Sequence, residues 1–118
     1  MSDVINVDEL KKNIEAFAKV RDWEQFHTPK NLACALNVEA SELLEVFQWM
    51  SVDEQKNISD EKKEAVAEEL SDILTYAIRL AGVLDINLSR SIEKKIEKNA
   101  KKYPAELVRG SSKKYDEY

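Results

Sequence analysis

The chain has 118 residues, a net charge of −5 and 35% charged residues. This length fits one domain with a core of its own. Two glycines and two prolines leave little material for turns, which disfavours an all-β or Rossmann-type chain. A general nucleic-acid binder is normally basic, so the acidic balance argues against a nucleic-acid polymer as partner.

The cellular setting is indicated by what the sequence contains and lacks. The single Cys34 cannot form an intrachain disulfide, which suits a reducing compartment and favours a buried structural thiol. The first residues, MSDVINVDELKK, include no apolar run of the signal-peptide type. No stretch approaches the ~18 apolar residues of a membrane span. We therefore expect a cytoplasmic protein with no membrane contact.

The first half of the chain predicts two helices separated by a loop. Asn6 with Glu9 three residues later is a capping arrangement that opens the first helix. Residues 23–27 predict a connecting loop. Thr28 as N-cap, followed by a proline, begins a second helix over residues 29–50.

The second half predicts three more helical segments. A capping box at the start of residues 52–57 indicates a short helical turn, and a long helix follows to about residue 83. Another helix begins after Asn87 and ends before Pro104. We expect an all-α, four-helix bundle-type domain over residues 1–104, with the short extra turn, and an irregular tail over residues 105–118.

The long helix that ends at about residue 83 has more apolar surface than one partner helix covers. Leu74 and Ile78 lie at about 140° and 180° from Glu69 on a helical wheel. An apolar back face on a chain of this size is typical of oligomers. We therefore expect a homodimer or homotetramer.

Two pairs of acids stand where the helical pattern calls for apolar residues: Glu39 with Glu42, and Glu69 with Asp72. On a wheel of 100° per residue, the first acid of each pair lies inside the apolar stripe, and the second lies about 60° away. An ionised carboxylate taken out of water is costly unless something pairs with it. The pattern therefore predicts that the four acids share a divalent metal.

The alternative for any such pair is a solvent-exposed helix face, but placement inside the stripe, twice at one spacing, favours the metal site. Four carboxylates form a hard oxygen site that suits Mg²⁺, with Mn²⁺ as a substitute. The single histidine, His27, lies outside both helices, which argues against a di-iron site. Structural Ca²⁺ stays open, although it typically uses loop carbonyls as well. Because Mg²⁺ prefers to share its ligands with phosphates, we expect a polyphosphate substrate.

The last long helix offers a candidate phosphate-binding face. Lys95, Asn99 and Lys102 follow the i, i+4, i+7 spacing and share one side of the helix. The alternative is an ordinary basic, solvated stripe. No glycine-rich phosphate loop is present, which excludes a Walker-type ATPase.

These acids and their surroundings resemble the MazG-like nucleotide pyrophosphohydrolases, all-α enzymes of the dUTPase/MazG superfamily. The family motif is ExxE, a spacer, and ExxD. The resemblance covers roughly residues 15–118 and is strongest to the small dCTP pyrophosphatase branch. It rests on four blocks, RDWEQFHTPKNLA (21–33), FQW (47–49), EELSDILTY (68–76) and KYPAELVRGSSKKYDEY near the end.

The resemblance implies hydrolysis of a nucleoside triphosphate to the monophosphate and pyrophosphate, as housecleaning of the nucleotide pool. It implies that the four motif acids bind Mg²⁺. Glu45 continues the first motif by one i,i+3 step, and Glu42 and Glu45 are the candidate catalytic residues, with Glu45 orienting water or a second metal. The nucleotide-binding residues that the branch implies are Trp23, Glu24, Gln25, Phe26, His27, Trp49 and Tyr76.

One position departs from the branch: Ile14 stands where a histidine is found elsewhere. The base preference, cytosine (modified or not) or adenine, is therefore left open. Two further hypotheses compete with an enzyme. They are a non-catalytic helical interaction module that uses the apolar back face, and a nucleotide-binding regulator.

Overall fold

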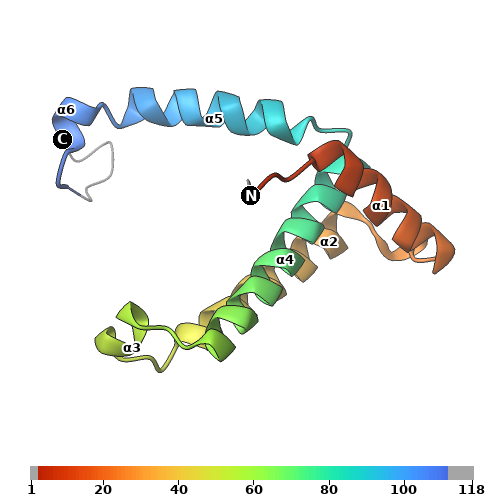
Figure 1. The fold of residues 1–118 in the computed structure, drawn as a ribbon. Helices are drawn as coiled ribbons and strands as arrows, with labels where there is room; N and C mark the ends of the chain where they lie inside the picture. Colours follow the sequence, from red (N-terminus) through yellow and green to blue (C-terminus); the bar gives the residue numbers. More distant parts are fainter. Residues whose placement is uncertain (1–2, 112–118) are drawn as a thin grey trace. The chain divides into compact units, whose positions relative to one another are not determined.

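The computed structural model describes residues 3–111, and every regular element within them is a helix (Figure 1). The chain divides into two units, Met1–Ile86 and Asn87–Tyr118. The helices of the first unit are α1 (Val7–Val20), the 3₁₀ turn η1 (Glu24–Phe26), α2 (Pro29–Phe47), α3 (Val52–Lys56) and α4 (Asp60–Val83). Those of the second are α5 (Leu88–Lys102) and α6 (Ala105–Val108).

The helices begin where the capping residues predict. The side chain of Asn6 accepts a hydrogen bond from the Glu9 backbone N–H at 3.0 Å, and Ser51 and Glu54 form both bonds of the capping box. Such caps satisfy backbone donors that have no partner inside the helix. The predicted all-helical chain and its helix starts are thus confirmed. The remaining side-chain caps are those of Thr28, Ser59 and Asn87.

In the first unit, α4 packs mainly against α2 and also against α1 (Figure 1), and the buried core residues lie on these three helices. The side chain of Leu32 on α2 is 1% exposed, and Ala18 on α1 is equally buried. Ile78 on α4 is buried within the chain as well, at 3% exposure, so its prediction as part of an unpartnered back face is wrong. Because α4 packs against two helices, part of its surface opposite Glu69 is covered. Leu74, at 45% exposure, stays on the surface.

Two further expectations differ from the structure. Cys34 is exposed, so the buried structural thiol is wrong. It lies two residues, about 200° of helical rotation, from the buried Leu32 and therefore faces the other side of α2. The tail expected to be irregular begins with the helical turn α6, and residues 112–118 of that tail lie outside the described residues. No helix in the described range is long and apolar enough to cross a membrane.

Candidate metal and nucleotide site

The packing of α2 on α4 brings three of the four predicted acids together. Glu39 on α2 and Glu69 and Asp72 on α4 each offer a carboxylate oxygen, and these three oxygens lie within 4.8 Å of one another. Glu39 and Glu69 are half-buried, whereas Asp72 is exposed. The acids are therefore convergent at the helix interface, and one of them opens toward solvent.

Two oxygens of this cluster are both buried and without partner. Neither the Oε2 atom of Glu39 nor that of Glu69 has a hydrogen-bond partner among the described residues. A buried acceptor of this kind normally costs free energy unless a donor or a cation satisfies it. The donor set consists of carboxylate oxygens only, as Mg²⁺ and Mn²⁺ prefer. The residues present therefore fit a hard divalent cation.

The electrostatics of the metal-free cluster agree with this fit. The pKa of Glu39 is raised to about 7, first by the adjacent carboxyl of Glu69, with which its protonated form can share a proton, then by burial and by Glu42 and Asp72. For Glu69, the adjacent carboxyl of Glu39 lowers the pKa, but burial and the nearby Glu42 and Asp72 outweigh it and the net shift is upward. Without a cation, the two glutamates therefore tend to hold a proton between them.

The remaining acids of the first motif are more open. Glu42 is exposed and is not one of the three residues with mutually close oxygens, yet its carboxylate raises the pKa of Glu39 by hydrogen bonding and charge. It therefore borders the cluster. Glu45 is also exposed. Its expected role in orienting water or a second metal stays a prediction.

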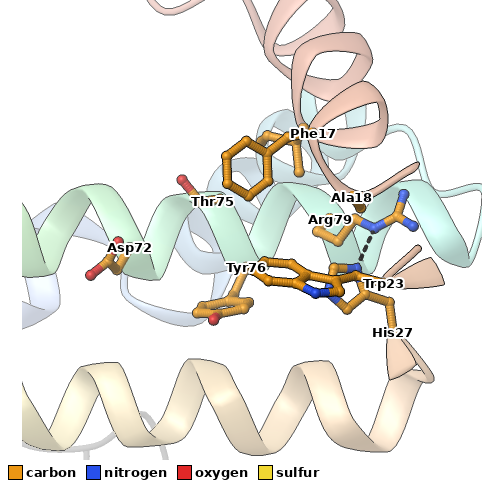
Figure 2. Close-up of a pocket in the computed structure, with 9 residues that line it drawn as sticks. Phe17, Ala18, Trp23, His27, Asp72, Thr75, Tyr76 and Arg79 are labelled. Atoms are coloured by element: carbon orange, nitrogen blue, oxygen red, sulfur yellow. Dashed lines mark hydrogen bonds between the residues drawn. The ribbon is translucent and has the colours of Figure 1, made fainter. Parts of the chain in front are cut away.

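A pocket of about 230 Å³ adjoins the acids and shares Asp72 with them. Figure 2 shows its side chains, which come from α1, the segment after α1, and α4. On α4, residues 72, 75, 76 and 79 follow helical spacing and line one side. The lining residues are Ile14, Phe17, Ala18, Trp23, His27, Asp72, Thr75, Tyr76 and Arg79.

Aromatic packing and a tight turn hold the segment that closes this pocket. The ring of Trp23 meets Phe17 edge-on, with 5.8 Å between centroids, and lies 6.5 Å from the His27 ring. Asp22 has φ 54°, a left-handed conformation that lets the chain reverse after α1. The Asn31 side chain donates a hydrogen bond to the Phe26 carbonyl at 3.0 Å. The segment is thereby fixed to both α1 and α2.

His27 is held at the pocket by a buried arginine. The Nε of Arg79 donates a hydrogen bond to Nδ1 of His27 at 3.0 Å, drawn as the dashed line in Figure 2. Burial and then the positive charge of Arg79 lower the pKa of His27, and Glu24 opposes them. The imidazole is therefore neutral at pH 7.

The structure separates the predicted nucleotide-binding residues into two groups. Trp23, His27 and Tyr76 line the pocket. The others lie outside its lining. Glu24 lines a more polar pocket, and the side chain of Gln25 bonds to Asp22. Phe26 and Trp49 are 59% and 86% exposed, and Lys95, Asn99 and Lys102 belong to α5 in the second unit. For both groups the role in nucleotide binding stays a prediction.

Four pocket residues were not singled out as binding residues from the sequence: Phe17, Ala18, Thr75 and Arg79. The place of Arg79 could have been predicted from helical periodicity, because on the helical wheel it lies about 80° from Glu69 and on the same side as Asp72. Its bond to His27, 52 positions away, has no counterpart in helical periodicity.

Fold and site together define a class of protein: all-helical, with paired carboxylates on two packed helices. Comparison with known families identifies the same class. The MazG-like family model matches residues 34–118, and the chain belongs to this family. The predicted resemblance is thereby confirmed.

Individual relatives within this family are pyrophosphatases by name. Human dCTP pyrophosphatase 1 is 41% identical over 113 residues, which are 94% of this chain and 66% of that protein. The rat protein of the same name is 42% identical over 111 residues, 92% of this chain and 65% of the relative. The chain thus spans just under two thirds of the length of these relatives. The crystal structure of a pyrophosphatase from Archaeoglobus fulgidus, 39% identical, gives a TM-score of 0.79 and covers 88% of this chain and 97% of its own.

Proposed function

We propose that this chain is a Mg²⁺-dependent nucleoside triphosphate pyrophosphohydrolase. It converts a (d)NTP and water to the (d)NMP and pyrophosphate, with dCTP or a modified dCTP preferred, and serves in nucleotide-pool housecleaning. The observation that carries the proposal is the pair of buried Oε2 atoms of Glu39 and Glu69, which have no hydrogen-bond partner among the described residues, beside an aromatic pocket of about 230 Å³. The names of the relatives, dCTP pyrophosphatase and pyrophosphatase, support the reaction and the substrate class.

The acids provide the cation site. Glu39, Glu69 and Asp72 hold the ion, and Glu42, which borders them, completes the set. When bound, Mg²⁺ supplies charge neutralisation for the triphosphate and lowers the pKa of a coordinated water. Glu45, one turn beyond Glu42, orients the attacking water or a second ion.

The aromatic pocket provides the nucleoside site. Trp23 and Tyr76 supply faces for stacking, which is worth ~1–3 kcal/mol per base–aromatic pair. Asp72 belongs to both the pocket and the acid cluster, so a nucleoside bound there has its phosphates directed to the acids. The chain's main contribution is then the positioning of reactants and the stabilisation of charge. Trp49, Glu24, Gln25 and Phe26 add further nucleotide contacts.

The second unit and a second copy of the chain complete the proposal. Lys95, Asn99 and Lys102 on α5 bind phosphate oxygens and stabilise the leaving pyrophosphate. Exposed apolar residues of the first unit, such as Leu44 at 66% and Leu74 at 45%, pack against another copy in a homodimer or homotetramer of four-helix bundle-type protomers. The enzyme acts in the cytoplasm.

Product analysis tests the proposal directly. The protein is incubated with each of the four dNTPs and with 5-modified dCTPs, with and without Mg²⁺, and the products are separated. We expect dNMP and pyrophosphate, highest for a cytosine nucleotide, and none after Asp72→Ala or Glu42→Ala. Glu61→Gln, an exposed acid in the first turn of α4, is the matched control and keeps full turnover. Orthophosphate with a diphosphate product, an active Asp72→Ala protein, or no Mg²⁺ dependence would contradict the proposal.

A further inference from the structure

Arg79 is an unusual element of the aromatic pocket. It is 8% exposed and is the one charged residue buried to that degree within residues 3–111. Removing a guanidinium from water is costly, so its position calls for a compensating role. Arg79 lines both the aromatic pocket and the neighbouring polar pocket that also contains Glu24. Its Nε bond to His27 is shown in Figure 2.

The direction of this hydrogen bond decides the state of His27. An arginine has only donors, so Nδ1 of His27 must be the acceptor and carries no proton. A neutral imidazole has one N–H, which is then on Nε2. Protonation of His27 would place a second N–H against a group that cannot accept it. The bond therefore excludes both the other tautomer and the imidazolium.

The other groups around His27 agree with this assignment. Glu24, on η1, favours the charged imidazole, but its effect is smaller than those of burial and Arg79. Asp72 lies in the same pocket on α4, and the residues contributed by α1 are apolar. No described group is thus positioned to reverse the preference set by Arg79.

We propose that Arg79 is a positioning residue that fixes His27 as the neutral Nε2–H tautomer, so that His27 presents a hydrogen-bond donor to an acceptor atom of the bound nucleoside. The inference rests on the proposed function, because it takes the aromatic pocket as the nucleoside site. A base or sugar oxygen, or an unprotonated ring nitrogen, is the chemical partner that such a donor selects. A group that can only donate is disfavoured at this point.

The single histidine of the chain makes the test direct, because its ring signals need no assignment. In ¹⁵N-labelled metal-free protein, long-range ¹H–¹⁵N spectra at pH 7 should show a protonated Nε2 and an unprotonated Nδ1. Titration should give a pKa below the ordinary value of 6.5. Arg79→Met should bring mixed tautomers and a higher pKa, and Arg79→Lys, which keeps a charged donor, should partly restore the wild-type spectrum. Arg90→Met, an exposed arginine on α5, is the matched control and should change nothing.

Kinetics give the second readout. For Arg79→Met we expect KM to rise roughly three- to tenfold with little change in kcat, as for one lost hydrogen bond between neutral groups. Wild-type spectra with Nδ1 protonated, or an unchanged tautomer and pKa in a folded Arg79→Met or Arg79→Lys protein, would overturn the inference. So would an unchanged KM after the tautomer has changed. Failure to produce pyrophosphate would refute the proposed function and leave the tautomer result standing, so the two failures are distinguishable.

Discussion

Glu39 and Glu69 stand on different helices, yet both belong to one cluster at the interface of α2 and α4, and the Oε2 atom of each is buried with no hydrogen-bond partner among residues 3–111. Two like charges in such a position destabilise the fold unless a proton or a cation neutralises them. The arrangement is understandable as a site that stores free energy for cation binding. Three properties of the protein can be measured: the pH dependence of its unfolding, the contribution of the aromatic pocket to KM, and its stability away from the site.

The first prediction concerns the stability of the metal-free protein against pH. The pKa of Glu39 is about 7 in the folded chain against an ordinary value of 4.5. Between these values the folded state binds more protons than the unfolded state, so the free energy of unfolding should fall as pH rises from 4.5 through 7. Thermal unfolding in EDTA should therefore give a lower Tm at pH 7.5 than at pH 5.5.

The variant Glu39→Gln isolates this effect, because it removes the titrating group and keeps the shape of the side chain. Its Tm should depend less on pH over the same range and should exceed that of the wild type at pH 7.5. Glu61→Gln, on an exposed turn, should keep the wild-type pH dependence. A wild-type Tm that rises from pH 5.5 to 7.5 in EDTA would show that the acids are not buried as described.

The second prediction separates two aromatic residues of one segment. Trp23 lines the pocket and packs edge-on against Phe17, whereas Phe26 is 59% exposed and is outside the lining. Loss of a stacking face costs ~1–3 kcal/mol, so Trp23→Ala should raise KM for the preferred dNTP by about one order of magnitude or more. Phe26→Ala should raise it less. Equal effects in steady-state kinetics would argue against the pocket as the nucleoside site.

The third prediction concerns stability away from the site. Gly82 lies in the last turn of α4, and a Cβ added there would meet the Lys11 side chain, with its Cε at 3.3 Å. Because that atom is near the end of a flexible chain, it can move aside. Alanine favours helix over glycine by about 1 kcal/mol, so Gly82→Ala should raise the free energy of unfolding by about 0.5–1 kcal/mol. Urea denaturation measures the change, and a destabilised variant would show that Lys11 is held in place.

The sequence predicted those parts of the molecule that depend on local rules. Helix starts follow from single capping residues such as Asn6 and Thr28, whose bonds are made within four residues. The pairing of Glu39 with Glu69 and Asp72 was also predictable, because an acid inside an apolar stripe must face another helix. The exposure of Cys34 was missed, although its place on the wheel relative to Leu32 contained the signal.

The parts that were not predicted depend on contacts distant in sequence. The bond between Arg79 and His27 joins a helix to a loop across 52 positions, and the 3₁₀ turn that presents Trp23 depends on packing against Phe17. Ile78 was placed on an outer face because the wheel shows where a side chain points but not how many helices pack around it. Ile78 is buried, and the helix that contains it packs against both α2 and α1.

The central claim, that inward-facing carboxylates hold a divalent cation, is tested most directly by calorimetric titration of the metal-free protein with Mg²⁺ at pH 7.5, repeated with Mn²⁺. We expect saturable binding by the wild type and by Glu61→Gln, and a loss of affinity of at least about tenfold in Glu69→Gln, which removes one charged ligand. Equal affinities in Glu69→Gln and the wild type would contradict the account.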